Sequence, residues 1–75
     1  MAMQPLRSIA IATDDFEVFE GERRTGRIYK LTFPTWEGWY WRLYAKAGHD
    51  AQEGLTESMA EAKRVFREAL EARER

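Results

Sequence analysis

The chain has 75 residues and a formal net charge of −1, with 12 Lys and Arg against 13 Asp and Glu, and 44% of its residues are hydrophobic. This length predicts a single domain, residues 1–75, with a core that is marginal for its size. The absence of Cys excludes disulfide bonds and thiolate metal sites as stabilisers, so good packing or self-association has to supply the stability.

The first part of the chain has the alternating pattern of β-strands. Residues 16–20 predict one strand, and residues 8–12 are an optional further strand; whether segment 1–13 is ordered stays open. Adjacent residues Asp14 and Asp15 indicate a turn rather than a metal pair, because neighbouring strand residues point to opposite faces. Residues 21–26 predict a polar loop that carries Arg23 and Arg24.

Two longer alternating segments follow, at residues 27–33 and 39–45. Pro34 ends the first of them, because proline cannot donate to a strand ladder. The face expected to be buried carries Tyr29, Leu31 and Phe33 from the first segment and Trp39, Trp41 and Leu43 from the second. The opposite face is expected to carry Ile28, Lys30 and Thr32 with Tyr40, Arg42 and Tyr44.

The hydrophobic period becomes helical after an optional strand at residues 51–55. Ser58 and Glu61 form a capping box that begins a helix over residues 58–73. Its apolar stripe consists of Met59, Ala62, Phe66, Ala69 and Leu70. One amphipathic helix and one meander must bury their apolar faces against each other. The sequence therefore predicts an α+β fold, in which an antiparallel three- to four-stranded meander packs on one C-terminal amphipathic helix.

The residue inventory argues against catalysis. The only serines are Ser8 and Ser58, and the only histidine, His49, lies in a predicted turn, so no nucleophilic triad can be assembled. No phosphate-binding loop, dinucleotide fingerprint or metalloprotease motif occurs. We therefore expect no enzyme, no cofactor and no metal site.

The aromatic residues are the unusual feature of the chain. Three Trp fall within residues 36–41, and the solvated sheet face is expected to display Tyr40, Arg42 and Tyr44. Such a face, with Lys30 beside it and Arg23, Arg24 and Trp36 at its rim, predicts a binding surface for a protein partner. The same face suits stacked bases and phosphates, so a nucleic-acid-binding module is the alternative. Against this nucleic-acid alternative, residues 1–52 hold seven basic and seven acidic residues, so this part of the chain is not the basic surface that nucleic acid needs.

Three further questions stay open from the residues alone. Trp36 is either a lid over the core, which its small domain favours, or an exposed anchor for a partner. An ordinary solvated sheet face also accounts for the outer residues. The chain is either a monomer or a homodimer that associates through its sheet face or edge strand.

The layout from Trp39 onward resembles a known family. The run Trp39-x-Trp41-Arg42-Leu43, a Gly-containing turn, and a helix opened by residues 58–63 (Ser-x-Ala-Glu-Ala-Lys) are similar to the strand–strand–helix modules of the YegP-like family. They are also similar to uncharacterised small proteins of bacteriophages and mobile elements. The arrangement loosely resembles the arm-binding domains of tyrosine integrases, but it lacks their strongly basic sheet. The phage-like resemblance implies an accessory role, such as an inhibitor of a host defence complex.

The residues predict a non-catalytic small protein-interaction module, and the phage-like resemblance implies that it inhibits or adapts a host protein complex. No apolar run is long enough to span a bilayer, and the first residues lack the basic and apolar segments of a secretory signal. We therefore expect a cytoplasmic protein with no membrane contact.

Overall fold

The computed structural model describes residues 5–74, so the first four residues of the N-terminal segment and Arg75 lie outside the described residues. Five strands come first: β1 (Leu6–Ala12), β2 (Asp15–Glu20), β3 (Arg23–Thr32), β4 (Glu37–Leu43) and β5 (Gln52–Thr56). A single helix, α1 (Met59–Glu74), follows them. The α+β class is confirmed, with both optional strands present, so the sheet has five strands rather than three or four.

The helix begins where the capping box placed it. The Ser58 Oγ accepts a hydrogen bond from the Glu61 amide at 3.1 Å, which satisfies one of the free N–H groups of the first turn. The predicted stripe faces the sheet, with Ala62, Phe66 and Leu70 buried in the core. The helical period and the cap were therefore sufficient to place α1.

The strands form a simple antiparallel meander in the order β1-β2-β3-β4-β5. Two-residue turns join β1 to β2 and β2 to β3, and each contains a residue with positive φ, namely Asp14 at 53° and Gly21 at 64°. Asp14 and Asp15 therefore lie at a turn, as predicted. The prediction of a loop at residues 21–26 is wrong, because β3 begins at Arg23 and is ten residues long.

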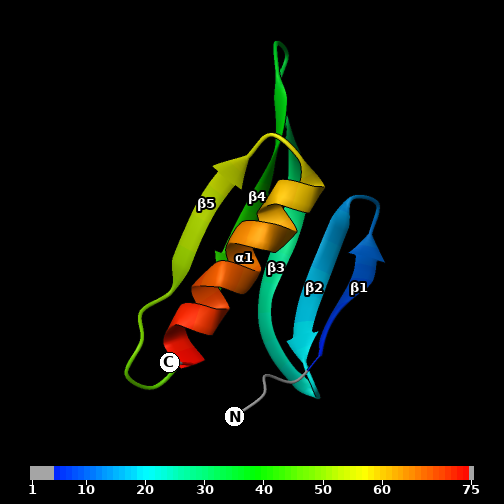
Figure 1. Cartoon of the computed structure of the whole chain (residues 1–75). Helices are drawn as coiled ribbons and strands as arrows, with labels where there is room; N and C mark the ends of the chain where they lie inside the picture. Colours follow the sequence, from blue (N-terminus) through cyan, green and yellow to red (C-terminus); the bar gives the residue numbers. More distant parts are fainter. Residues whose placement is uncertain (1–4, 75) are drawn as a thin grey trace.

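The helix covers only part of the sheet. It packs on β3, β4 and β5, whereas β1 and β2 lie to one side of it (Figure 1). A helix is about 10 Å wide and strands are about 4.8 Å apart, so one helix covers roughly three neighbouring strands. The hairpin of β1 and β2 therefore extends beyond the two-layer part of the domain.

The core lies between α1 and the near face of β3 and β4. Trp41 meets Phe66 edge-to-face, with ring centroids 6.3 Å apart. Two glycines give these rings their space, because a Cβ atom on Gly26 would come within 2.4 Å of the Phe66 ring and one on Gly54 within 2.7 Å of the Trp41 indole. The buried apolar residues are Val18, Ile28, Trp41, Leu43, Ala62, Phe66 and Leu70.

The sequence prediction for the faces of β3 is wrong. Ile28 pairs with Trp41, and Tyr29 pairs with Tyr40, so Ile28 is the core residue of this strand. Tyr29 and Leu31, which were expected in the core, lie on the face turned away from α1. Phe33, also expected in the core, is 45% exposed.

Candidate interaction surface

The outer face is the sheet face turned away from α1. Because paired residues in an antiparallel sheet share a face, the register places its side chains in rows across the strands. One row consists of Asp15, Tyr29, Tyr40 and Leu55, and the next consists of Ile9, Glu17, Arg27, Arg42 and Glu53. Tyrosines and arginines therefore lie side by side on β3 and β4, with carboxylates on β2 and β5 to either side.

Tyr40 and Arg42 lie on the outer face, as the alternation of β4 requires, and Tyr44, one residue beyond β4, lies against the Arg24 guanidinium. Tyr40 packs against Tyr29 with ring centroids 5.0 Å apart. The Tyr40 hydroxyl and the Arg42 guanidinium both donate hydrogen bonds to the Glu53 carboxylate on β5. The bond to Glu53 raises the pKa of the Tyr40 hydroxyl, since the neighbouring carboxylate disfavours the phenolate.

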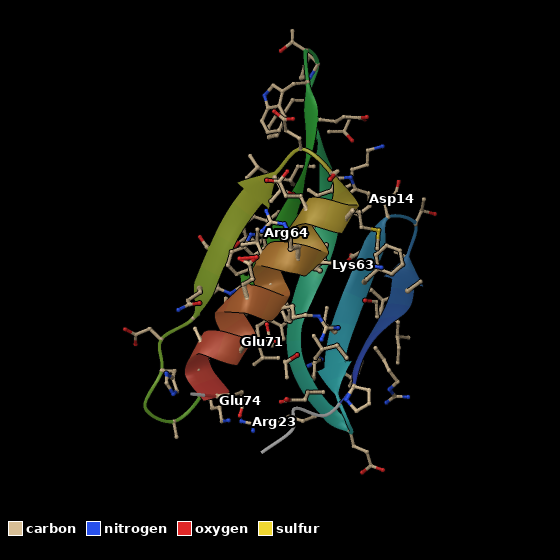
Figure 2. The ribbon with its side chains drawn as sticks, in the orientation of Figure 1. Asp14, Arg23, Lys63, Arg64, Glu71 and Glu74 are labelled. Atoms are coloured by element: carbon tan, nitrogen blue, oxygen red, sulfur yellow. The ribbon has the colours of Figure 1, made fainter. Side chains whose placement is uncertain are left out.

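Two of the predicted rim residues occupy strand β3 instead of a loop. Arg24 forms an ion pair with Glu17 at 3.3 Å, and its guanidinium lies 5.9 Å from the centroid of the Tyr44 ring. Arg24 therefore belongs to the outer face itself. Arg23 is exposed at the start of β3, at the opposite end of the molecule from the hairpin that joins β3 to β4 (Figure 2).

Lys30 was expected on the outer face, and that prediction is wrong. It pairs with Trp39 on the side of the sheet that carries α1, and its ammonium forms an ion pair with Glu37 at 3.1 Å. The error follows from the reversed faces of β3. Lys30 is therefore not part of the outer face.

Trp36 lies in the hairpin between β3 and β4, where the sequence favoured a lid over the core. Instead, its indole stacks on Phe33 with ring centroids 4.5 Å apart, and both side chains are 45% exposed. Gly38 provides the space, because a Cβ atom there would come within 2.8 Å of the Trp36 ring and 3.4 Å of Leu55. Leu55 is itself 51% exposed.

These three residues, Phe33, Trp36 and Leu55, form a group that we call the end patch. They gather where Gly38 leaves the sheet surface without a side chain, next to the row that contains Tyr40. Large apolar side chains that stay in water in a monomer commonly mark a site of association. The structure thus brings Trp36 near Tyr40 but leaves Arg23 at the far end.

Three arginines of the outer face are held by carboxylates. Arg27, which the sequence did not single out, donates two hydrogen bonds to Asp15, at 2.9 and 2.6 Å. The Arg27 guanidinium also lies 4.7 Å from the centroid of the Tyr29 ring. Arg24, Arg27 and Arg42 each have an acidic partner, so the face carries little net charge.

The Asp15–Arg27 pair leads to a test of stability against pH. The bidentate hydrogen bond lowers the pKa of Asp15, so its stabilising effect is complete above the unfolded-state pKa of about 3.9 and is lost as the pH falls through the folded-state pKa. We expect Asp15→Asn to lower the free energy of unfolding at pH 7 by about 0.5–1 kcal/mol and to leave it less dependent on pH below 4. Urea denaturation between pH 2 and 7 measures this, and parallel pH profiles for the two proteins would contradict it.

A second cationic region lies beside the helix. A groove of about 610 Å³ separates α1 from the hairpin of β1 and β2, and Lys63 and Arg67 line it. Figure 2 shows Lys63 on the side of α1 that faces β2 and β3. Neither side chain forms an ion pair within residues 5–74.

Comparison with known proteins does not assign the chain to a family. No protein-family model matches it, and no curated protein or solved structure is significantly similar to it. Among residues 5–74, no group of three acidic or histidine side chains is placed to hold a metal ion. The described part of the chain contains no helix that is long and apolar enough to cross a membrane.

Proposed function

We propose that this chain is a non-catalytic protein-interaction module whose outer face docks on a partner protein. The observation that carries this proposal is the end patch, in which Trp36 and Phe33 are stacked on each other and remain exposed. Trp, Tyr and Arg dominate the energetic centres of protein interfaces, and this face combines all three types. The module would act by occupying a surface of its partner, as an inhibitor or an adaptor.

The ion pairs of the outer face support a protein partner for a second reason. Arg24, Arg27 and Arg42 are held in place by their carboxylates, so less side-chain freedom is lost on binding. A rigid aromatic and guanidinium surface next to apolar side chains can exclude water from a complementary protein surface. This favours docking without rearrangement of the sheet.

The same ion pairs argue against nucleic acid as the partner. A phosphate would have to displace Glu17, Asp15 or Glu53 from its guanidinium before it gained a contact. Binding to nucleic acid depends on releasing counterions from phosphates that free cations neutralise. We therefore expect the outer face to bind neither single- nor double-stranded DNA or RNA at about 50 mM salt, where phosphate contacts are stronger than at physiological salt.

The docking site is tested by capture of partner proteins from a lysate of the source cells. We expect Trp36→Ser/Leu55→Ser to reduce the captured partner at least about tenfold, because an interface centre commonly contributes 2 kcal/mol or more, roughly a 30-fold change in affinity. Tyr40→Ala/Tyr44→Ala should reduce capture in the same direction. Quantitative mass spectrometry of the captured proteins measures both effects.

The matched control changes side chains that are equally exposed but lie on the opposite side of the molecule. Glu68→Ala/Glu71→Ala on the solvent side of α1 should capture as much partner as the unaltered chain. Circular dichroism establishes that each variant is folded before capture is compared. Equal capture by the end-patch variant and the helix variant would show that the outer face is not the docking site.

A further inference from the structure

The two edges of the sheet differ in how well they are protected against pairing. In the described part of the chain, β1 and β5 each have a neighbouring strand on one side only. Strand β5 is five residues long, carries Glu53, and contains Gly54. Strand β1 is seven residues long, and its only charged residue is Arg7. Natural proteins block free edges with charges, short strands, bulges or covering elements, and β1 has only one charge, Arg7, and one register irregularity, between Ala10 and Ala12.

The outward residues of β1 are unusually apolar for a solvated edge. Ile9 and Ile11 are 43% and 50% exposed; Ile9 lies on the outer face beyond Glu17 of β2, and Ile11 lies at the register irregularity between Ala10 and Ala12. Figure 1 shows α1 on the far side of β2 from this edge, so the helix does not cover it. The unpaired backbone groups and the two isoleucines are therefore available together.

We propose that β1 is a homodimerisation edge, which pairs antiparallel with β1 of a second copy of this chain. Full overlap of Leu6–Ala12 with the same strand of the copy places the two-fold axis at Ile9, the middle residue of the strand. The two Ile9 side chains then face each other, and each Arg7 lies opposite Ile11 of the copy. The two five-stranded sheets become one continuous sheet.

The chemistry of the strand fits a second copy. In this register no charged residue lies opposite a like charge, since the two Arg7 side chains lie at opposite ends of the pairing. The two Ile9 side chains meet on the outer face, which removes exposed apolar surface of β1 from water. The Arg7 guanidinium is already drawn away from the edge, because it donates to the Gly21 carbonyl at 3.0 Å.

Association through β1 would also give the hairpin of β1 and β2 contacts that α1 does not supply. The hairpin of β1 and β2 lies outside the region that α1 covers, and it contributes one buried residue to the core, Val18, with Leu6 packed against the core. Pairing of two such hairpins gives each β1 a second neighbouring strand. The dimer would also carry two end patches on one sheet face, so that a partner with two sites would be bound with avidity.

Sedimentation over a wide range of concentrations, with matched edge variants, tests the proposal. We expect a concentration-dependent dimer that Ile9→Lys weakens at least tenfold, because this change places two like charges at the two-fold axis. Leu55→Lys makes the same kind of change at an equally exposed residue of the other edge strand and should leave the dimer intact. A strict monomer, or a dimer that Leu55→Lys disrupts and Ile9→Lys does not, would overturn the proposal.

A cysteine cross-link tests the register. The chain has no Cys, so Ile9→Cys introduces the only thiol, and directly opposed strand residues have Cβ atoms close enough for a disulfide. Mild oxidation of this variant should yield a covalent dimer, whereas Leu55→Cys should stay monomeric on a denaturing gel. Equal cross-linking of the two variants would show random collision and overturn the register.

Discussion

Phe66→Ala is expected to remove most of the free energy of unfolding of the protein at room temperature. Phe66 is 1% exposed and packs against Trp41 on the sheet and over Gly26. Replacing a buried Phe by Ala typically costs about 3–5 kcal/mol, from lost burial and the cavity that remains. A domain of this size has a total free energy of unfolding on the order of 5 kcal/mol. Urea denaturation followed by circular dichroism and tryptophan fluorescence measures the loss.

Phe33 is the matched control for this prediction. It is the same residue type on the same domain, but it is half exposed in the end patch and stacks only on Trp36. Phe33→Ala should therefore cost no more than about 1 kcal/mol. If the two substitutions lowered the free energy of unfolding equally, the assignment of Phe66 to the core and Phe33 to the surface would be wrong.

The helix could be predicted from sequence because its signals are local. The serine cap, the acidic residue three positions later and the apolar period all depend on neighbours within two turns. The structure begins α1 at Met59 and buries Ala62, Phe66 and Leu70, as the pattern indicated. Local signals of this kind do not depend on which strands pair.

The faces of β3 could not be predicted, because both faces of this strand carry plausible core residues. Tyr29, Leu31 and Phe33 are more hydrophobic as a set than Gly26, Ile28 and Lys30. The helix nevertheless packs on the second set, since Gly26 leaves room for the Phe66 ring. Alternation identifies a strand, but the buried face depends on how closely its partner can approach.

The candidate site was predicted in part for the same reason. Tyr40, Arg42 and Tyr44 follow from β4, where Trp39, Trp41 and Leu43 leave little doubt about the core side. The carboxylate partners of the arginines were not predictable, because Asp15, Glu17 and Glu53 reach them only through the register of other strands. Those partners change a face that looked cationic into one that is nearly neutral.

The lack of a covering layer among the described residues explains why the outer face of this domain is so aromatic. With one helix for five strands, the outer face has no covering layer in the described part of the chain. Tyr29 and Tyr40 pack on each other and Tyr44 lies against Arg24, while the Tyr40 hydroxyl binds the Glu53 carboxylate. The same side chains that stabilise an uncovered sheet therefore also supply the contact area that a partner would use.

Gly26→Ala is expected to destabilise the protein by about 3 kcal/mol, a large effect for the addition of one methyl group. A Cβ atom at this position would come within 2.2 Å of the Arg42 carbonyl oxygen and 2.4 Å of the Phe66 ring. The first contact is with the backbone of β4, which cannot move without breaking the ladder that joins it to β3. Both the sheet and the helix would have to shift, because neither contact is with the end of a flexible side chain.

Gly48→Ala separates this steric effect from the loss of glycine itself. Gly48 has a positive φ of 83°, but no atom lies within 4 Å of the position that its Cβ would occupy. Its substitution should cost only the backbone strain of an L-residue, about 1 kcal/mol. Gly26 does not have a positive φ, so its larger loss would come from packing alone. Equal urea midpoints for the two alanine variants would contradict the close approach of Phe66 and β4 at Gly26.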